Sequence, residues 1–149
     1  MILDERSEFC DATALSTSGT GLALVGDVMD LTNIGEEIGQ SRVFLVIQVA
    51  TAVTSGGSAT VAFQLVSDAA AAIAADGTET LHWESEALAV ATLIAGYQLV
   101  VPVPLHNPTY ERYLGIQQNV GTAALTAGAI NAFLTLDPNG WKAYPDGSN

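Results

Sequence analysis

At 149 residues the chain fits a single domain that is long enough to bury roughly two-thirds of its unfolded surface. Its 16 acids and four bases give a formal net charge of −12, which repels nucleic-acid phosphates and anionic membranes, so we expect no nucleic acid and no membrane as partner. Only 13% of the residues are charged, about half the usual share, which favours a surface partly covered by other subunits.

The N-terminal stretch "MILDERSEF" lacks a basic segment followed by a long apolar one, so we expect no signal peptide. Cys10 is the sole cysteine and can form no intramolecular disulfide, which fits a reducing compartment at synthesis. The domain organisation that we expect is an N-terminal arm over 1–21, a β-sandwich over 22–137 and a C-terminal arm over 138–149.

Alternating apolar residues predict the first three strands of the sandwich. They lie in "LALVGDVMDL" (22–31), "RVFLVIQVATAVT" (42–54) and "SATVAFQLVSD" (58–68). The glycines of "SGGS" (55–58) predict a hairpin turn between the second and third strands. The inward sets are Val43, Leu45, Ile47, Val49 and Val53 in the second strand and Val61, Phe63 and Leu65 in the third.

The middle of the chain mixes a helical signal with a strand signal. The alanine-rich "DAAAAIAADG" (68–77) predicts one or two helical turns that Gly77 ends. In "TETLHWES" (78–85), alternation predicts that Leu81 and Trp83 point inward and that His82 and Glu84 point outward.

The uncharged run from Leu88 to Leu105 has the length of a membrane span, but its glycine, prolines and period-two second half predict two strand segments instead. Proline cannot donate to a strand ladder, so "YQLVVPVPL" (97–105) should lie at a sheet edge. "RYLGIQQNV" (112–120) and "AGAINAFLTL" (127–136), joined by a Gly/Thr/Ala turn, complete about seven strands. The inward residues of this part are Tyr97, Leu99, Val101, Val103, Leu114, Ile116, Ile130 and Leu134.

Reactive side chains do not form a recognisable catalytic or metal pattern. His82 and Glu84 share a predicted face, but two ligands are too few for zinc. Cys10 is expected to be a small apolar residue, His106 a turn residue, and Arg112 a structural partner of an acid at a strand end. Paired carboxylates at 27 and 30, 36 and 37, and 84 and 86 are expected surface acids. We therefore predict that the protein is not an enzyme and binds no metal or cofactor, and that it functions by binding through its surface.

Two stretches of the chain resemble one family. "MILDERSEFCDATALSTSGTG" is similar to the N-terminal arm of the capsid-cementing (decoration) proteins of tailed phages, and "AGYQLVVPVPLHNPTYERYLGIQQNVGTAALTAGAINAFLT" is similar to their second half. The departures are Cys10, where serine is expected, and Gln118, where an aromatic residue is less surprising. The positions that carry the family pattern are Asp4, Phe9, Cys10 (as the small residue after Phe9), Asp11, Ala12, Gly96, Pro104, Arg112, Tyr113, Leu114, Thr126, Ala127 and Gly128.

The resemblance implies an all-β, single-domain antiparallel β-sandwich of jelly-roll type with extended N- and C-terminal arms. It implies a virion structural protein, made in the host cytoplasm, that binds the outside of the assembled capsid and bridges neighbouring capsomers. Its partners would be the major capsid protein and itself, as a dimer or trimer. The expected contact residues are Phe9, Asp11, Trp141 and Tyr144, with packing of each arm on its own sandwich as the alternative.

Two alternatives remain open at the level of the sequence. One is a carbohydrate-binding, lectin-like sandwich, which would need Trp83, Tyr97 and Tyr110 exposed on one face. The predicted inward orientation of Trp83 and Tyr97 counts against it. The other is a head-fibre or tail structural component, since such proteins are also rich in strands and lack catalytic residues.

Overall fold

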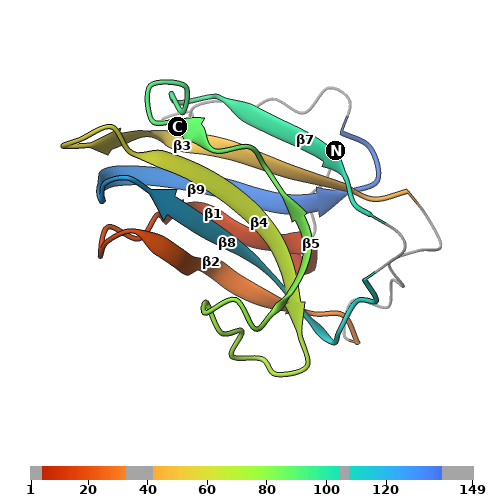
Figure 1. Ribbon diagram of the computed structural model, residues 1–149. Coiled ribbons are helices and arrows are strands. Elements are labelled where there is room, and N and C mark those ends of the chain that lie inside the picture. Colours follow the sequence, from red (N-terminus) through yellow and green to blue (C-terminus); the bar gives the residue numbers. More distant parts are fainter. Residues whose placement is uncertain (1–4, 33–41, 105–107, 139–149) are drawn as a thin grey trace.

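The computed structural model describes residues 5–32, 42–104 and 108–138, which form a two-layer β-sandwich (Figure 1). Within these ranges there is no α-helix, and no helix is long and apolar enough to cross a membrane. The elements are the 3-10 helix η1 (Glu5–Ser7) and the strands β1 (Glu8–Ala14), β2 (Gly21–Asp30), β3 (Phe44–Ser55), β4 (Thr60–Asp68), β5 (Thr80–Glu84), β6 (Leu88–Ala89), β7 (Gln98–Pro102), β8 (Tyr113–Gly121) and β9 (Leu125–Thr135).

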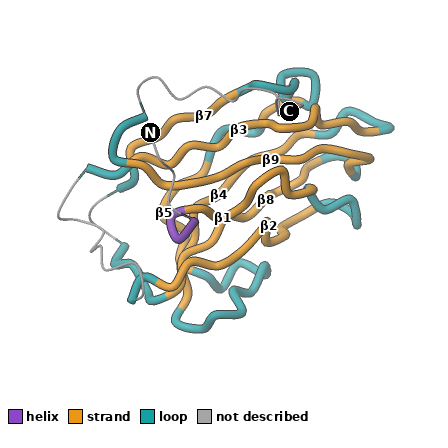
Figure 2. The backbone as a smooth tube through the Cα atoms, turned by 180° about the vertical axis from the view of Figure 1, so that it is seen from behind, coloured by secondary structure: helices purple, strands orange, loops and turns teal. Residues whose placement is uncertain are grey.

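The strands form two antiparallel sheets, which confirms the predicted all-β sandwich. One sheet, here called sheet A, has the order β1-β9-β3-β7, and the other, sheet B, has the order β2-β8-β4-β5 with β6 beside β4. Their strands run in two layers across the view of Figure 2. The pairs β1–β9, β2–β8, β3–β7 and β4–β5 are nested along the chain, so early strands pair with late ones. The jelly-roll type stays a prediction.

The predicted hairpin at 55–58 is wrong, and the Gly/Thr/Ala turn between the last two predicted strands does not form a hairpin either. The strands on either side of residues 56–59 lie in different sheets, because β3 pairs with β7 and β9 whereas β4 pairs with β5, β6 and β8. The same holds for 112–135, where β8 belongs to sheet B and β9 to sheet A. Each short loop therefore crosses from one layer to the other. Alternation could not reveal this, since strands that face one core from opposite layers show the same period as strands paired in one sheet.

The core between the sheets is built from the residues that alternation predicted. All the inward residues named for β3, β4, β8 and β9 are buried in one apolar cluster, and Phe63 of the central strand β4 is fully buried. The proline-bearing strand β7 lies at the edge of sheet A, as predicted, with Leu99 and the preceding Tyr97 packed against the core. Burial of these side chains is the main force that holds the two layers together.

The alanine-rich stretch forms no helix. After β4 the chain makes bends, and Asp68 accepts a hydrogen bond from the backbone N–H of Ala70 at 2.9 Å. Ile73 is buried, and Gln117 of β8 donates to the carbonyl of Ala74 at 2.9 Å. Alanine alone offers no apolar stripe to repay helix nucleation, so these contacts with sheet B set the shape of the loop instead.

The side-chain orientation predicted for β5 is also partly wrong. Trp83 packs against the core as predicted, but Leu81 is 44% exposed. The register shifts between the pairs Leu65–Trp83 and Val66–Leu81, which inserts His82 as an extra residue opposite β4. This bulge ends the alternation and turns Leu81 to the outer face.

The expected N-terminal arm is in part a strand. Residues 8–14 form β1, which pairs with β9 at the edge of sheet A. The following segment is fixed by Gln118, whose side-chain amide accepts from the N–H of Ser16 at 2.8 Å and donates to the carbonyl of Ser16 at 3.0 Å. Gln118 is buried, so this pair of bonds explains why an amide stands where an aromatic residue was less surprising. Most of the expected C-terminal arm, 139–149, lies outside the described residues.

Candidate functional site

The four predicted contact residues have different positions. The ring of Phe9 is only 1% exposed and belongs to the core, so it packs on its own sandwich. The neighbouring Asp11 is exposed on the edge strand β1. Trp141 and Tyr144 lie outside the described residues. Among the described candidates, Asp11 is therefore the one whose side chain is exposed, and its contact with a partner stays a prediction.

His82 is engaged in a polar cluster at one end of sheet B. Its Nε2 lies 2.7 Å from the hydroxyl of Ser67, which also accepts the backbone N–H of Glu111 at 3.1 Å. The imidazole stacks on the ring of Tyr110 at a centroid distance of 3.8 Å and an angle of 13°. The Tyr110 hydroxyl in turn donates to the carbonyl of Pro104 at 2.7 Å. The cluster ties the segment before β8 to β4 and β5.

This arrangement resembles a serine–histidine pair, but it cannot act as one on a substrate. Ser67 is fully buried, so no substrate can reach its hydroxyl. The Nδ1 atom of His82 is also buried and has no hydrogen-bond partner among the described residues. A positioned acid on that nitrogen is what a catalytic histidine requires. The cluster therefore has a structural role: it holds the segment before β8 against β4 and β5.

Acidification is expected to weaken this cluster. Burial lowers the pKa of His82 below its usual 6.5, and the Glu111 carboxylate offsets part of that effect. Because the folded chain holds this proton less tightly than the unfolded chain, the stability is fully present above pH 6.5 and falls as the pH drops toward the folded pKa. Urea denaturation at about pH 8 and about pH 5 measures the loss. In His82→Phe, which keeps a ring on Tyr110, the pH dependence should be smaller, and an unchanged dependence would contradict the assignment.

The possible metal ligands His82 and Glu84, and the cysteine Cys10, also have structural environments that explain them. His82 bonds to Ser67 and Glu84 accepts from Gln64 at 2.9 Å, and these two β4 residues are three positions apart, so they face opposite sides of the sheet. The prediction that His82 and Glu84 share a face is therefore wrong, and the described ranges contain no group of three possible metal ligands. Burial raises the pKa of Cys10 to about 12, which keeps the thiol protonated and unreactive. His106 lies outside the described residues.

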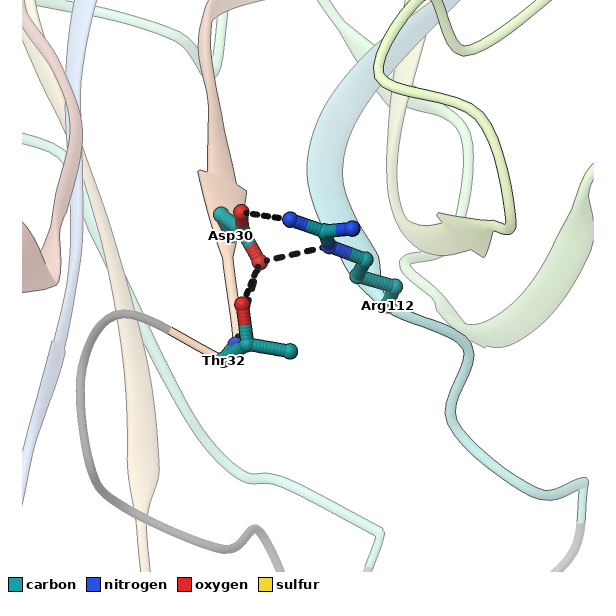
Figure 3. A network of polar contacts seen from close by, with 3 residues as sticks. All are labelled: Asp30, Thr32 and Arg112. Atoms are coloured by element: carbon teal, nitrogen blue, oxygen red, sulfur yellow. Dashed lines mark hydrogen bonds and ion pairs between the residues drawn. The ribbon is translucent and has the colours of Figure 1, made fainter.

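Arg112 closes a strand end, as predicted, by binding Asp30 through two hydrogen bonds (Figure 3). Its Nε donates to Asp30 Oδ1 at 3.1 Å and its Nη2 donates to Oδ2 at 2.9 Å. The hydroxyl of Thr32 donates to the same Oδ1 at 2.7 Å. The guanidinium also lies 4.9 Å from the centroid of the Tyr113 ring. These contacts fix the end of β2 against the start of β8.

Low pH should remove the contribution of this ion pair. The hydrogen bonds from Arg112, and then from Thr32, hold the pKa of Asp30 well below its usual 3.8. Stability from such a group is present above the unfolded pKa and is lost as the pH falls through the folded one. The difference in unfolding free energy between the wild type and Arg112→Gln should therefore shrink on acidification from about pH 7 to about pH 2.5.

The matched control is Arg42→Gln, which removes an exposed base just before β3. It should change the unfolding free energy by less than about 0.5 kcal/mol. A wild-type minus Arg112→Gln difference that stays constant across this pH range would contradict the role assigned to Asp30.

The aromatic residues that a lectin-like surface would require do not gather on one exposed face. Trp83 and Tyr97 are partly buried and packed against the core. Tyr110 is stacked on His82, and burial raises its pKa to about 12. A sugar ring needs an exposed aromatic platform, so these three residues do not supply one as arranged here.

Several of these contacts were not predictable from local patterns. The hydroxyl of Ser67 meets Glu111 across 44 positions of sequence, and Gln118 meets Ser16 across 102. Such pairings follow from the sheet topology, which alternation does not specify. The one available signal was the pair of glutamines 117 and 118 in a strand that also contains Leu114 and Ile116, since polar residues in a buried strand require partners.

The fold and these contacts define a class: a two-sheet β-sandwich whose described reactive side chains are used for structural bonds. Residues 9–134 match the model of the Bbp16 family, and the chain therefore belongs to that family. No curated protein matches the chain.

Proposed function

We propose that the chain is a virion structural protein that binds the outside of the assembled phage capsid and stabilises it by bridging neighbouring capsomers of the major capsid protein. In this proposal the protein is not an enzyme and needs no cofactor. It acts as a homo-oligomer, a dimer or a trimer, on the capsid exterior after synthesis in the host cytoplasm.

The observation that carries the proposal is that the potentially reactive side chains described above make structural contacts within the fold. Cys10 is buried with its thiol 3.5 Å from the carbonyl of Ile130, Ser67 and His82 fasten the segment before β8, and Arg112 closes a strand end. These four side chains are engaged in contacts within the fold and are not presented to a substrate. The structural use of these side chains favours a function that depends on binding surfaces.

The family and the topology support the same proposal. The name of the Bbp16 family suggests a phage protein, and the matched range of 9–134 covers most of both stretches that resemble capsid-cementing proteins. The nested strand pairs, in which β1 meets β9 and β4 meets β5, are the arrangement expected of a jelly roll. That is the fold which the resemblance implies.

The mechanism is thermodynamic. A protein that binds only the assembled, expanded shell stabilises that state by mass action, by an amount that grows with its free concentration relative to Kd. Repetition of a modest contact by the symmetry of the shell makes the combined effect large. The net charge of −12 disfavours contact with packaged DNA, which fits the outer face of the shell.

The carbohydrate-binding alternative lacks support from the described aromatic residues, which are packed or stacked. A head-fibre or tail component differs from a cementing protein in where it binds. A shell-stability assay therefore separates these functions from the proposed one.

The proposal is tested by heating expanded empty shells with and without saturating protein and following shell dissociation by light scattering. The protein should raise the dissociation temperature, and the increase should depend on protein concentration and then saturate. An unchanged dissociation temperature at saturating protein would count against the capsid function.

A further inference from the structure

The outer face of sheet B is covered at one end and open at the other. Toward the end of β4, the loop over 69–77 lies on this face, with Ile73 buried and Gln117 fully covered. Toward the start of β4 the face forms an open hollow of about 300 Å³. The hollow is lined by Thr60, Ala62, Glu84, Ser85, Ala87, Asn119 and Gly121.

The side chains around the hollow present oxygen atoms to a donor. Glu84 uses one carboxylate oxygen to accept from Gln64 and remains exposed. The side chains of Thr60 and Asn119 make no hydrogen bond with any residue in the described ranges. Gly121 keeps the space beside Thr60 open, because a Cβ atom at this position would lie 2.8 Å from its hydroxyl oxygen. An open site of this size, at the lower limit for small-molecule pockets, suits one inserted side chain.

The charge of the hollow favours a positively charged side chain as its occupant. Its seven described lining residues include an acid and no base. The described bases lie at the opposite end of the sandwich, since Arg6, Arg42 and Arg112 come just before β1, β3 and β8, whereas the hollow lies where β8 ends and β4 begins. No base in the described ranges is therefore placed to supply the cation that would complement Glu84.

A second copy of the chain is a poor source of that cation. Its described bases are at the end far from its own hollow, so the contact would join one copy to the next head to tail. Such contacts leave an open chain of subunits unless the rotation closes a ring.

We propose that this hollow is a docking site for a lysine or arginine side chain of the major capsid protein. The identity of the partner rests on the proposed function, whereas the chemistry of the site rests on the hollow itself. The ammonium or guanidinium group would donate to the Glu84 carboxylate and to the side-chain oxygens of Thr60 and Asn119, with its stem on Ala62 and Ala87.

The chemistry of the site is tested on the purified protein with N-acetyl-arginine amide as the probe, followed by NMR. We expect saturable shifts at the Asn119 side-chain amide and at the Ala62 backbone, with millimolar affinity. Glu84→Gln should remove most of the shift. The matched control is Glu86→Gln, which removes an equal charge two positions away at an exposed residue outside the lining, and it should leave the shifts in place. Equal loss in both variants would overturn the site.

The partner is tested by binding the same variants to expanded empty shells. Glu84→Gln should bind about two- to fivefold more weakly than Glu86→Gln. Asn119→Arg, which fills the hollow with the chain's own cation, should bind more weakly still.

Equal binding by the Glu84 and Glu86 variants would overturn the inference and leave the proposed function standing. Probe binding without any shell binding by the wild type would contradict the proposed function and the assigned partner. A change in self-association of Glu84→Gln in sedimentation velocity would show a second copy as occupant and overturn the assignment.

Discussion

Replacement of Gly26 by alanine is expected to be strongly destabilising. Gly26 interrupts β2 with a φ of +73°, and a Cβ atom there would overlap the backbone carbonyl of Phe9 and lie 2.5 Å from the Cβ of Cys10. The obstructing atoms belong to β1, which is held by its pairing with β9, so they cannot move aside cheaply. Steric overlap and an unfavourable φ together should cost roughly 2 to 6 kcal/mol.

Urea denaturation followed by tryptophan fluorescence measures the effect of Gly26→Ala, because Trp83 is packed against the core. Gly96→Ala is the matched control: its φ is +88°, but no atom lies within 4 Å of the added Cβ. The control should lose only about 1 kcal/mol, from the backbone conformation alone. Equal losses in the two variants would contradict the close packing of β1 on β2.

Truncation of Phe63 to alanine is expected to have an effect of comparable size. Phe63 lies in β4, an interior strand of sheet B, and its ring is fully buried between the two sheets. Removing the ring deletes apolar burial and leaves a cavity that neighbouring strands cannot close, which should cost about 3 to 5 kcal/mol. The unfolding free energy from urea denaturation checks this value.

Leu81→Ala is the control for Phe63→Ala and also tests the bulge in β5. Alternation predicts an inward Leu81, but the side chain is 44% exposed in the structure. Its truncation should therefore cost less than about 1 kcal/mol. A loss comparable to that of Phe63→Ala would show that Leu81 is a core residue and that the register assigned to β5 is wrong.

The sequence was sufficient to predict the class of fold and most of the core. Alternation identifies the inner face of a strand directly, because successive side chains point to opposite sides. The inward residues of β3 and β4, such as Leu45 and Phe63, were predicted on this basis and are buried. The edge position of β7 followed from proline chemistry, which is equally local.

The pairing of the strands was not predictable in the same way. A short loop with glycines, such as the one at 56–59, serves equally for a hairpin and for a crossing between layers. The bulge at His82 changed the side on which its ring lies, and one inserted residue leaves no mark in the sequence pattern. The alanine-rich stretch was assigned by its propensity, but tertiary contacts of Ile73 decided its conformation.

The candidate site was less predictable than the fold. The pairing of Arg112 with an acid at a strand end was anticipated in kind, but Asp30 as its partner follows only from the pairing of β2 with β8. The hollow beside Glu84 depends on where β8 ends relative to β4, and on Gly121 facing Thr60. Prediction of a site formed by three strands requires the register of the sheet, which a single sequence does not specify.

Co-sedimentation with capsid shells is the decisive test of the proposal that this chain binds and stabilises the assembled shell. Purified protein is mixed with expanded empty shells of the phage that encodes it, with unexpanded shells as the control. We expect saturable binding to expanded shells, with a fixed number of copies per capsomer, and no binding to the unexpanded form. An absence of binding to both kinds of shell would contradict it.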